Sequence, residues 1–180
     1  MLTAEEVIAH YKLEPLDQEG GFFRQVWKSG LLVNNDTLCE RYPDEGTHPM
    51  GTLIYFLITT DSFSAMHRLP TAEHWFFHMG DPLEMLLLHG DGRGEIAMLG
   101  TDLKAGQQVQ LTVPMDSWQG TRIAEGADEY GWSLGSCVMV PGFEWTDFEL
   151  GDRSLLIKEY PEHAAAIERR TRETPVQGSL

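Results

Sequence analysis

The sequence predicts an all-β domain, either a sandwich or a barrel, with a short helix near each end. Many short stretches are rich in β-branched and aromatic residues. Turn residues separate these stretches at intervals of about 8–12 positions, a spacing typical of sandwiches and barrels. Strands do not alternate with helices, so a Rossmann-type fold is not expected. The 180 residues have the length of one domain, and we expect a single domain over 1–180.

The expected helices lie at the two ends of the chain. Thr3 and Glu6 fit a capping box, in which each side chain accepts a hydrogen bond from the backbone of the other residue. Val7 then begins an apolar face. Proline suits a helix start, so residues 161–173 are expected to form a second helix. Residues 174–180 are expected to fray.

The expected strands fill the chain between these helices. Gly20 and Gly21 mark a sharp turn before the first strand, because glycine enters positive φ freely. Residues 34–50 are rich in turn formers and are expected to form a loop. Gly90 and Gly92 flank Asp91 in a hairpin signal. The strands are expected over residues 22–27, 52–58, 63–67, 74–79, 83–89, 95–99, 109–113, 134–140 and 155–158.

Charge and composition exclude several classes of partner. The formal net charge is −15, with 13 Lys and Arg against 28 Asp and Glu. A surface this acidic repels phosphate backbones and anionic lipids, so neither nucleic acid nor a membrane is expected as a partner. The chain starts without a basic region and apolar run, which favours a cytoplasmic protein. Cys39 and Cys137 are expected to be reduced thiols, because they are far apart and form no zinc-type CxxC pair.

The residues with the clearest chemical pattern lie between positions 67 and 80. His67 is followed by Glu73, and Gly80 comes after six further residues. Side chains on one face of a strand recur at every second position, and two neighbouring strands bring such faces together. We therefore expect His67 and Glu73 to point into the barrel as a possible base and acid.

This spacing resembles the first cupin motif, G-x5-H-x-H-x3-4-E-x6-G. Asp61 stands at the position of the leading glycine, and Leu69 stands at the position of the second histidine. The second cupin motif, G-x5-P-x-G-x2-H-x3-N, aligns only loosely. Pro114 fits it, but Asp116 replaces its glycine and Gln119 replaces its histidine.

The resemblance also bears on metal binding. A typical cupin metal is held by three histidines and a glutamate, and two of those imidazoles are replaced here. If a metal binds, the resemblance implies His67, Glu73 and Gln119 as its ligands. Because so few ligands seldom hold a transition metal tightly, we expect little bound metal. Whether any cofactor binds is left open by the sequence.

Four ordered blocks resemble one family within this superfamily. The blocks are residues 19–24, 52–57, 73–83 and 137–149, and the similarity spans about residues 5–158. They are similar to the signature blocks of the cupin-five family, formerly a domain of unknown function. The resemblance implies a jelly-roll barrel core over about 5–158, a helix and tail over 161–180, and a homodimer. It also implies a shape like that of dTDP-sugar epimerases, without a settled activity.

Further residues are candidates for lining an interior pocket. Trp75, Phe77, Trp118 and Tyr55 are aromatic candidates, although core packing explains such residues equally well. Arg24 is a candidate clamp for an anionic substrate, with a structural ion pair as the alternative. We expect one interior pocket, lined by His67, Glu73, Trp75 and Gln119, to bind a small polar molecule.

Other polar residues have simpler interpretations. His74 and His78 are spaced as in a helical zinc motif, but the aromatic residues between them favour a strand. On a strand they share the face opposite Glu73, so at least one is expected on the surface or at an interface. Asp147 and Glu149 are expected at a solvated strand edge rather than as catalytic carboxylates.

Three functions remain open from the sequence. The first is a metal-independent isomerase or epimerase of a carbohydrate or nucleotide-sugar, which needs a base and an acid. The second is a metal-dependent oxygenase or isomerase with an incomplete ligand set. The third is a non-catalytic protein that binds a small polar ligand. One fold hosts many chemistries, so the fold does not choose between them. Phe22 and Phe23 are expected on an apolar edge strand that favours a homodimer.

Overall fold

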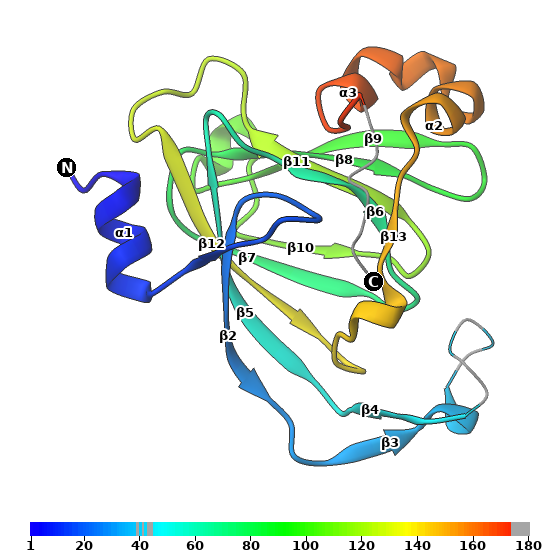
Figure 1. Cartoon of the computed structure of the whole chain (residues 1–180). Helices are drawn as coiled ribbons and strands as arrows, with labels where there is room; N and C mark the ends of the chain where they lie inside the picture. The colour runs from blue at the N-terminus through cyan, green and yellow to red at the C-terminus, as the bar shows by residue number, and fades with distance from the viewer. Residues whose placement is uncertain (39, 41, 43–44, 174–180) are drawn as a thin grey trace.

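Two antiparallel sheets face each other and curl into a jelly-roll barrel (Figure 1). The structure is a computed structural model that describes residues 1–38, 40, 42 and 45–173. The first sheet has the strand order β1 (Glu14–Pro15), β2 (Phe22–Lys28), β5 (Thr52–Thr59), β12 (Trp132–Met139), β7 (Glu73–Gly80) and β10 (Gln110–Val113). The second has the order β13 (Glu149–Leu150), β6 (Ser64–Arg68), β11 (Trp118–Ile123), β8 (Leu83–Leu88) and β9 (Gly94–Leu99). The predicted all-β fold class is confirmed.

The core lies between the two sheets, where alternate residues of the strands face inward. Phe56 and Trp75 meet edge to face there, with ring centroids 5.4 Å apart. Met85 and Leu87 pack against them from the opposite sheet. Burial of large apolar side chains such as these supplies most of the driving force for folding.

Helices cover the outer faces of both sheets. The helix α1 (Ala4–Tyr11) covers the six-stranded sheet, where Val7 joins a buried cluster with Leu57 and Trp132. Its predicted capping box is confirmed: Glu6 N donates to Thr3 Oγ1 over 3.3 Å, and Thr3 N donates to Glu6 Oε2 over 2.8 Å.

A C-terminal segment covers the five-stranded sheet. It comprises α2 (Arg153–Glu159), η4 (Pro161–His163) and α3 (Ala164–Glu168) (Figure 1). Beyond α3, the fully buried Arg170 donates to Glu84 Oε1 over 2.7 Å. Arg172 donates to the carbonyl oxygen of Gln18 over 2.7 Å.

Three predictions of local structure are wrong. Residues 155–158 belong to the helix α2, which Asp152 caps by accepting from Leu155 N over 2.9 Å. The second helix predicted over 161–173 is only the short η4 and α3. The expected loop at 34–50 contains η1 (Asn35–Thr37) and β4 (Thr47–Pro49), and its first residue ends β3 (Leu32–Asn34). The strand β11 was not among the predicted strands.

Two further expectations concern the ends and edges of the chain. The predictions for Cys39 and for residues 174–180 lie outside the described residues. Phe22 and Phe23 are not on an open edge, because they pair with β1 on one side and with β5 on the other. Within the described part of the chain, no helix is long and apolar enough to cross a membrane.

Candidate functional site

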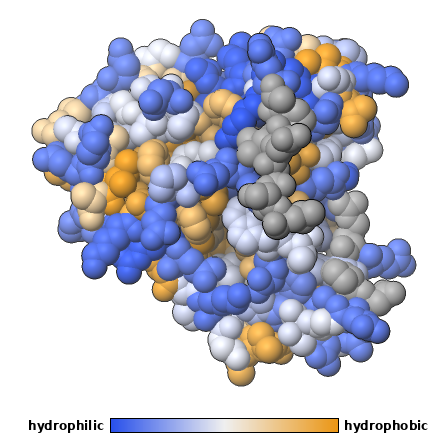
Figure 2. Space-filling view, viewed as in Figure 1, coloured by the Kyte–Doolittle hydropathy of each residue, from blue (hydrophilic) through white to orange (hydrophobic). Residues whose placement is uncertain are grey.

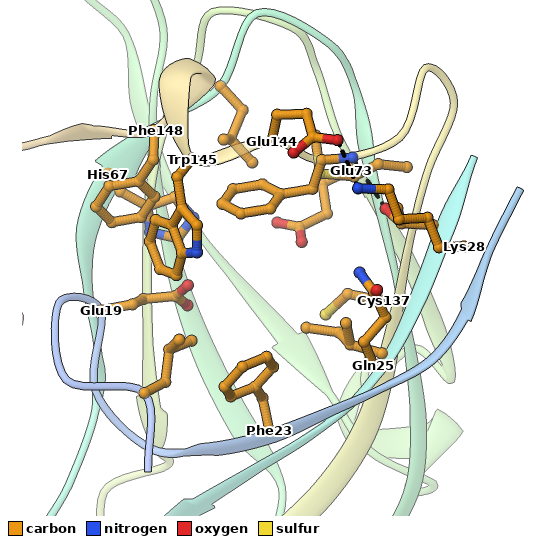
Figure 3. Close-up of a pocket in the computed structure, with 16 residues that line it drawn as sticks. Glu19, Phe23, Gln25, Lys28, His67, Glu73, Cys137, Glu144, Trp145 and Phe148 are labelled. Atoms are coloured by element: carbon orange, nitrogen blue, oxygen red, sulfur yellow. Dashed lines mark hydrogen bonds and ion pairs between the residues drawn. The ribbon is translucent and has the colours of Figure 1, made fainter. Parts of the chain in front are cut away.

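One end of the barrel encloses a cavity of about 390 Å³. Its walls come from β2, β5, β6, β7 and β12 and from the segment before β13 (Figure 3). The polar lining consists of Glu19, Gln25, Lys28, Thr52, His67, Glu73 and Glu144. The rest is largely apolar: Leu16, Phe23, Ile54, Leu69, Cys137, Met139, Phe143, Trp145 and Phe148. Such a largely apolar pocket with a few convergent polar groups is typical of a small-molecule site.

The buried carboxyl group of Glu73 is held by hydrogen bonds from residues that do not line the cavity. Gln119 Nε2 donates to Glu73 Oε2 over 2.6 Å, and Trp75 Nε1 donates to the same oxygen over 3.1 Å. Trp75 Nε1 also lies 3.2 Å from Gln119 Oε1. Burial raises the pKa of Glu73, opposed in part by His67. The other oxygen, Oε1, receives neither of these bonds, so the carboxyl group retains an atom that can hold a proton.

His67 is a buried imidazole whose proton position is set by its neighbour. Its Nδ1 lies 2.7 Å from the carbonyl oxygen of Ala65, which can only accept a hydrogen bond. Nδ1 therefore carries the proton in the neutral ring, and Nε2 has the free electron pair. Burial lowers the pKa of His67, opposed by Glu73 and by the bond to Ala65. Phe148 stacks on the ring at 5.1 Å between centroids.

Glu19 adds a second carboxyl group to the same cavity (Figure 3). Ser64, which is fully buried, donates to Glu19 Oε1 over 2.5 Å. Burial raises the pKa of Glu19 from 4.5 to about 7, while Ser64 and Arg172 act in the opposite direction. Glu19 also contributes to the raised pKa of Glu73. The cavity therefore combines one neutral base with two carboxyl groups that retain protons unusually well.

Comparison with known proteins decides the family. The family model Cupin_5, described as "Cupin superfamily (DUF985)", matches residues 5–151. This chain is a member of that cupin family.

Its relatives extend this similarity across almost the whole chain. A hypothetical protein from Leishmania major is 31% identical, with a TM-score of 0.82, covering 96% of this chain and 100% of that one. A protein from Shewanella oneidensis is also 31% identical at a TM-score of 0.82, covering 97% and 100%. An uncharacterised protein of Saccharomyces cerevisiae is 27% identical over 160 residues, 83% of this chain and 77% of the relative.

More distant similarity concerns the fold alone. A cupin-2 domain protein from Rhodospirillum rubrum is 14% identical, with a TM-score of 0.52, covering 83% of this chain and 78% of that one. The expected relationship to cupins is thus confirmed, and the expected jelly-roll architecture with it.

The donor set of this cupin does not fit a tightly held transition metal. Within the described residues, no group of three or more His, Cys, Asp or Glu side chains is placed to hold a metal ion. Leu69 lines the cavity where an imidazole would be needed. The amide of Gln119 is engaged with Glu73 and Trp75. Of the four usual cupin ligand positions, one imidazole and one carboxyl group remain, and Glu19 does not complete a metal-binding group with them, which leaves too few ligands for tight binding.

Some of the aromatic and polar residues singled out from the sequence support the cavity without lining it. Trp75 and Gln119 are buried behind Glu73 and act on its carboxyl group. Phe77 packs against the central cluster of the barrel, away from the cavity. The sequence predicted that these residues lie in the interior of the barrel and line the cavity. They lie in the interior but are not among the residues that line the cavity.

Other predicted ligand contacts lie on outer faces of the barrel. Arg24 donates to the carbonyl oxygen of Tyr11 over 3.1 Å, and Tyr55 packs on the Tyr11 ring at 4.9 Å. Strand alternation explains this, because their neighbours Phe23 and Ile54 face the cavity instead. Trp118 packs beneath the C-terminal helices and has the Arg68 guanidinium 4.5 Å from its ring, also outside the cavity.

The two histidines of β7 also lie outside the cavity. His74 Nδ1 lies 3.0 Å from Thr112 Oγ1, and His78 Nε2 lies 3.0 Å from Ser136 Oγ. Both occupy the strand face opposite Glu73, as the alternation predicted.

Several residues at the cavity were not identified as candidates from the sequence. Glu19 sits in the turn before β2, and Lys28 lies at the other end of that strand. The expectation of a solvated Asp147 is wrong: its side chain is only 2% exposed and is paired with His48. Glu149 is exposed and pairs with Arg68 over 2.7 Å, in keeping with a strand edge.

Proposed function

We propose that the cavity binds a small neutral molecule rich in hydroxyl groups, of carbohydrate type, and moves a proton on it without a metal. The reaction class is isomerisation or epimerisation. The observation that supports it is that His67 and Glu73 line one cavity, where burial lowers the pKa of the imidazole and raises that of the carboxyl group. Oppositely perturbed acid and base groups are the arrangement that such chemistry needs.

The lining favours a neutral sugar over an anionic ligand. Aromatic faces of Trp145, Phe143 and Phe148 suit the apolar face of a sugar ring, while carboxyl groups accept hydrogen bonds from its hydroxyls. The two carboxyl groups inside and Glu144 at the wall offer no positive charge to compensate a phosphate or a nucleotide-sugar. Lys28, the lysine among the lining residues, already pairs with Glu144 over 2.6 Å. A cavity of about 390 Å³ lies toward the small end of the range for small-molecule pockets, which favours a small ligand.

The proposed chemistry uses each group in the protonation state that its surroundings favour. His67 Nε2 takes the proton from the carbon beside a carbonyl group, so that a C–H bond breaks and an N–H bond forms. Glu73 donates its proton to the carbonyl oxygen, which gives a neutral enediol. For isomerisation, His67 returns the proton to the former carbonyl carbon, while the hydroxyl group on the carbon that lost its proton gives its own proton to Glu73 and becomes the new carbonyl group. For epimerisation, the intermediate turns in the cavity, His67 returns the proton to the other face of the same carbon, and the hydroxyl group formed in the first step gives its proton back to Glu73.

A ligand screen with labelled solvent tests this proposal. Thermal shifts would be measured for neutral aldoses, ketoses, nucleotide-sugars and small acids, against the wild type and His67→Ala. Sugars that stabilise the wild type would then be incubated in D₂O and followed by proton NMR for deuterium beside the carbonyl. We expect a neutral sugar to bind and to exchange, and His67→Ala to abolish the exchange.

The controls separate catalysis from binding and from structure. Arg24→Ala, which lies outside the cavity, is expected to behave like the wild type. Binding without deuterium incorporation would support a non-catalytic binding protein instead. Absence of any stabilising ligand, with His67→Ala unstable by a few kcal/mol, would show that the pair is structural and reject the proposal.

We also propose that the protein forms a homodimer in the cytoplasm. Support comes from exposed apolar side chains on β2 and on the β3–β4 hairpin with the residues that flank it. These are Trp27, Leu31, Leu32 and Met50. Figure 2 shows a hydrophobic patch at the lower end of the molecule, where the chain passes from β2 toward β3. Exposed apolar patches on a charged surface mark interaction sites. Sedimentation at micromolar concentration should show that the wild type is a dimer. The double variant Leu31→Asp/Leu32→Asp should be a monomer. A monomeric wild type would refute the proposal.

A further inference from the structure

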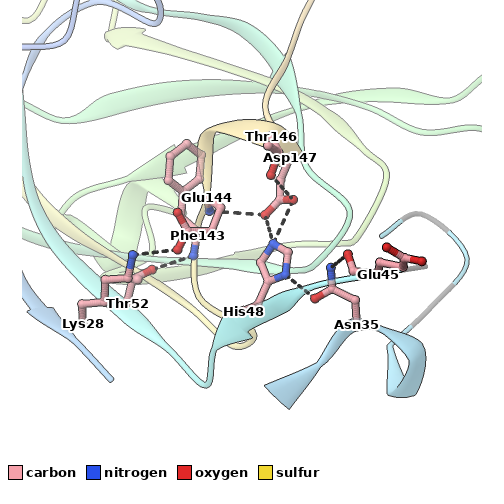
Figure 4. Close-up of polar contacts among 9 residues, drawn as sticks. All are labelled: Lys28, Asn35, Glu45, His48, Thr52, Phe143, Glu144, Thr146 and Asp147. Atoms are coloured by element: carbon pink, nitrogen blue, oxygen red, sulfur yellow. Dashed lines mark hydrogen bonds and ion pairs between the residues drawn. The ribbon is translucent and has the colours of Figure 1, made fainter. Parts of the chain in front are cut away.

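A buried chain of hydrogen bonds connects the β3–β4 hairpin to one wall of the cavity (Figure 4). It consists of Asn35, His48 and Asp147, and we call it the polar relay. His48 of β4 is 3% exposed. Its Nδ1 lies 2.7 Å from Asn35 Oδ1, and its Nε2 lies 3.0 Å from Asp147 Oδ2 and 3.1 Å from Asp147 Oδ1. Asp147 is 99 residues away in the sequence, so the relay fastens two distant segments together.

The hydrogen-bond partners determine how many protons the relay contains. Asn35 Nδ2 donates to the carbonyl oxygen of Glu45 over 3.2 Å, so Asn35 Oδ1 faces His48 as an acceptor. His48 Nδ1 must therefore donate. On the other side the ring faces the Asp147 carboxyl group, so one more proton lies between Nε2 and Asp147. The contacts hold together only while this second proton is present.

The relay lies directly behind the wall of the cavity. We call residues 143–148 the rim segment; Phe143, Glu144, Trp145 and Phe148 from it line the cavity. Asp147 Oδ2 also accepts from Glu144 N over 3.3 Å. Phe148, the residue after Asp147, stacks on His67. A polar contact nearer to solvent is the Lys28–Glu144 pair, whose side chains are 45% and 37% exposed. At the start of the rim segment, Phe143 N donates to Thr52 Oγ1 over 2.9 Å. Exposed pairs contribute little, so the buried relay is the main polar attachment of the later rim residues.

We infer that His48 and Asp147 are positioning residues for the cavity, which hold the rim segment against the barrel only while they share a proton. The inference concerns the site of the proposed function, but it does not depend on which molecule binds there. Loss of the proton as pH rises leaves an imidazole electron pair facing a buried carboxylate, and the rim segment then loosens. Burial raises the pKa of Asp147, which acts in the same direction, because the folded protein resists ionisation of that group.

No further charged group is in contact with the ring within the described residues. The groups that face His48 are Asn35, Asp147 and the edge of Tyr42, whose ring centroid lies 4.8 Å away. Lys28 and Glu144 on the rim are the next charged pair, and they bond to each other. The pH response is therefore assigned to the His48–Asp147 pair.

Two substitutions separate positioning from general stability. His48→Phe keeps a ring beside Tyr42 but removes both nitrogens. Asp147→Asn keeps the geometry and changes the proton requirement: its amide can donate to the electron pair of a neutral His48 while its oxygen accepts from Glu144 N. In Asp147→Asn the rim segment should therefore be held firmly while the His48 ring is neutral, and it should loosen as pH falls. The wild-type rim segment should instead loosen as pH rises.

Hydrogen–deuterium exchange of the intact protein without ligand tests the inference. Rates would be followed by mass spectrometry from pH 5.5 to 9 and corrected for the intrinsic effect of pH. The wild-type rim segment should exchange about tenfold faster at pH 9 than at pH 5.5. In His48→Phe the rim segment should exchange rapidly over the whole pH range. Peptides from β8 and β11 should exchange at the same rate in both proteins. Nitrogen-15 spectra of His48 should differ between the two proteins, because Nε2 shares a proton with a carboxyl group in the wild type and accepts a hydrogen bond from an amide in Asp147→Asn.

The outcomes are decisive either way. Equal acceleration of rim and barrel peptides in His48→Phe would overturn the inference, since the relay would then be a general core contact. The same pH trend in Asp147→Asn as in the wild type would also overturn it. Failure of the sugar screen would leave these measurements unaffected, so the two proposals fail independently.

Discussion

Replacing Glu19 by glutamine should stabilise the protein at alkaline pH by up to about 3 kcal/mol. The pKa of Glu19 is raised from 4.5 to about 7, chiefly by burial. A group that is harder to ionise in the folded state destabilises that state once it is forced to ionise. The cost is absent below pH 4.5, grows as pH rises to 7 and stays constant above it. Glutamine has no such cost and can still accept the hydrogen bond from Ser64.

Urea unfolding followed by tryptophan fluorescence measures this difference. The wild type and Glu19→Gln would be compared at several pH values from 4.5 to 8.5. Their stabilities should be similar at pH 4.5 and diverge as pH rises, with the variant the more stable. Glu14→Gln serves as the control, because that residue is exposed on the neighbouring strand and should leave the wild-type profile unchanged.

A pH-independent difference between the two proteins would refute the reasoning, because the Glu19 carboxyl group would then not be titrating in the folded state. A variant less stable at every pH would show that the carboxylate is favoured where it lies. Either result would also weaken the proposed cavity chemistry, since Glu19 contributes to the raised pKa of Glu73.

Two further predictions concern buried hydrogen bonds. Gln119→Ala removes the 2.6 Å bond to Glu73 and should destabilise by about 1–3 kcal/mol in urea unfolding, whereas Gln110→Ala on an exposed face should have almost no effect. Asp81→Ala removes the carboxylate that accepts from the backbone of Tyr130 and of the residue on each side of it, and thermal unfolding should show a loss of roughly 2–4 kcal/mol. A loss below 0.5 kcal/mol would contradict either prediction.

Strand patterns in the sequence predicted most of the sheet because alternation is a local property. They failed where tertiary contacts decide the structure. The four residues 155–158 are too short an apolar run to distinguish strand from helix, and the cap from Asp152 favours the helix. The strand β11 contains Gly120 and polar residues on both faces, so it shows little alternation. An added Cβ at Gly120 would lie 2.5 Å from Met66 Sδ, so a larger residue there would require the buried Met66 side chain to move.

The cavity was predicted in part for the same reason. His67 and Glu73 follow from spacing on two strands. Arg24 and Tyr55 were misplaced because the sequence does not show which face of β2 and β5 is interior. Glu19 lies in a turn, where no periodicity relates it to His67, and only the folded chain brings the two together.

The C-terminal segment has a consequence for where this protein can be divided. The cupin match ends at residue 151, but Arg170 lies under the five-stranded sheet and binds Glu84. A chain cut at the family boundary would keep every strand of the barrel and expose Leu86 and Leu88 to water. It would also free the turn that holds Glu19, because Arg172 binds Gln18. The span that the family model matches is therefore smaller than the unit of folding, and a fusion partner should be joined beyond residue 173.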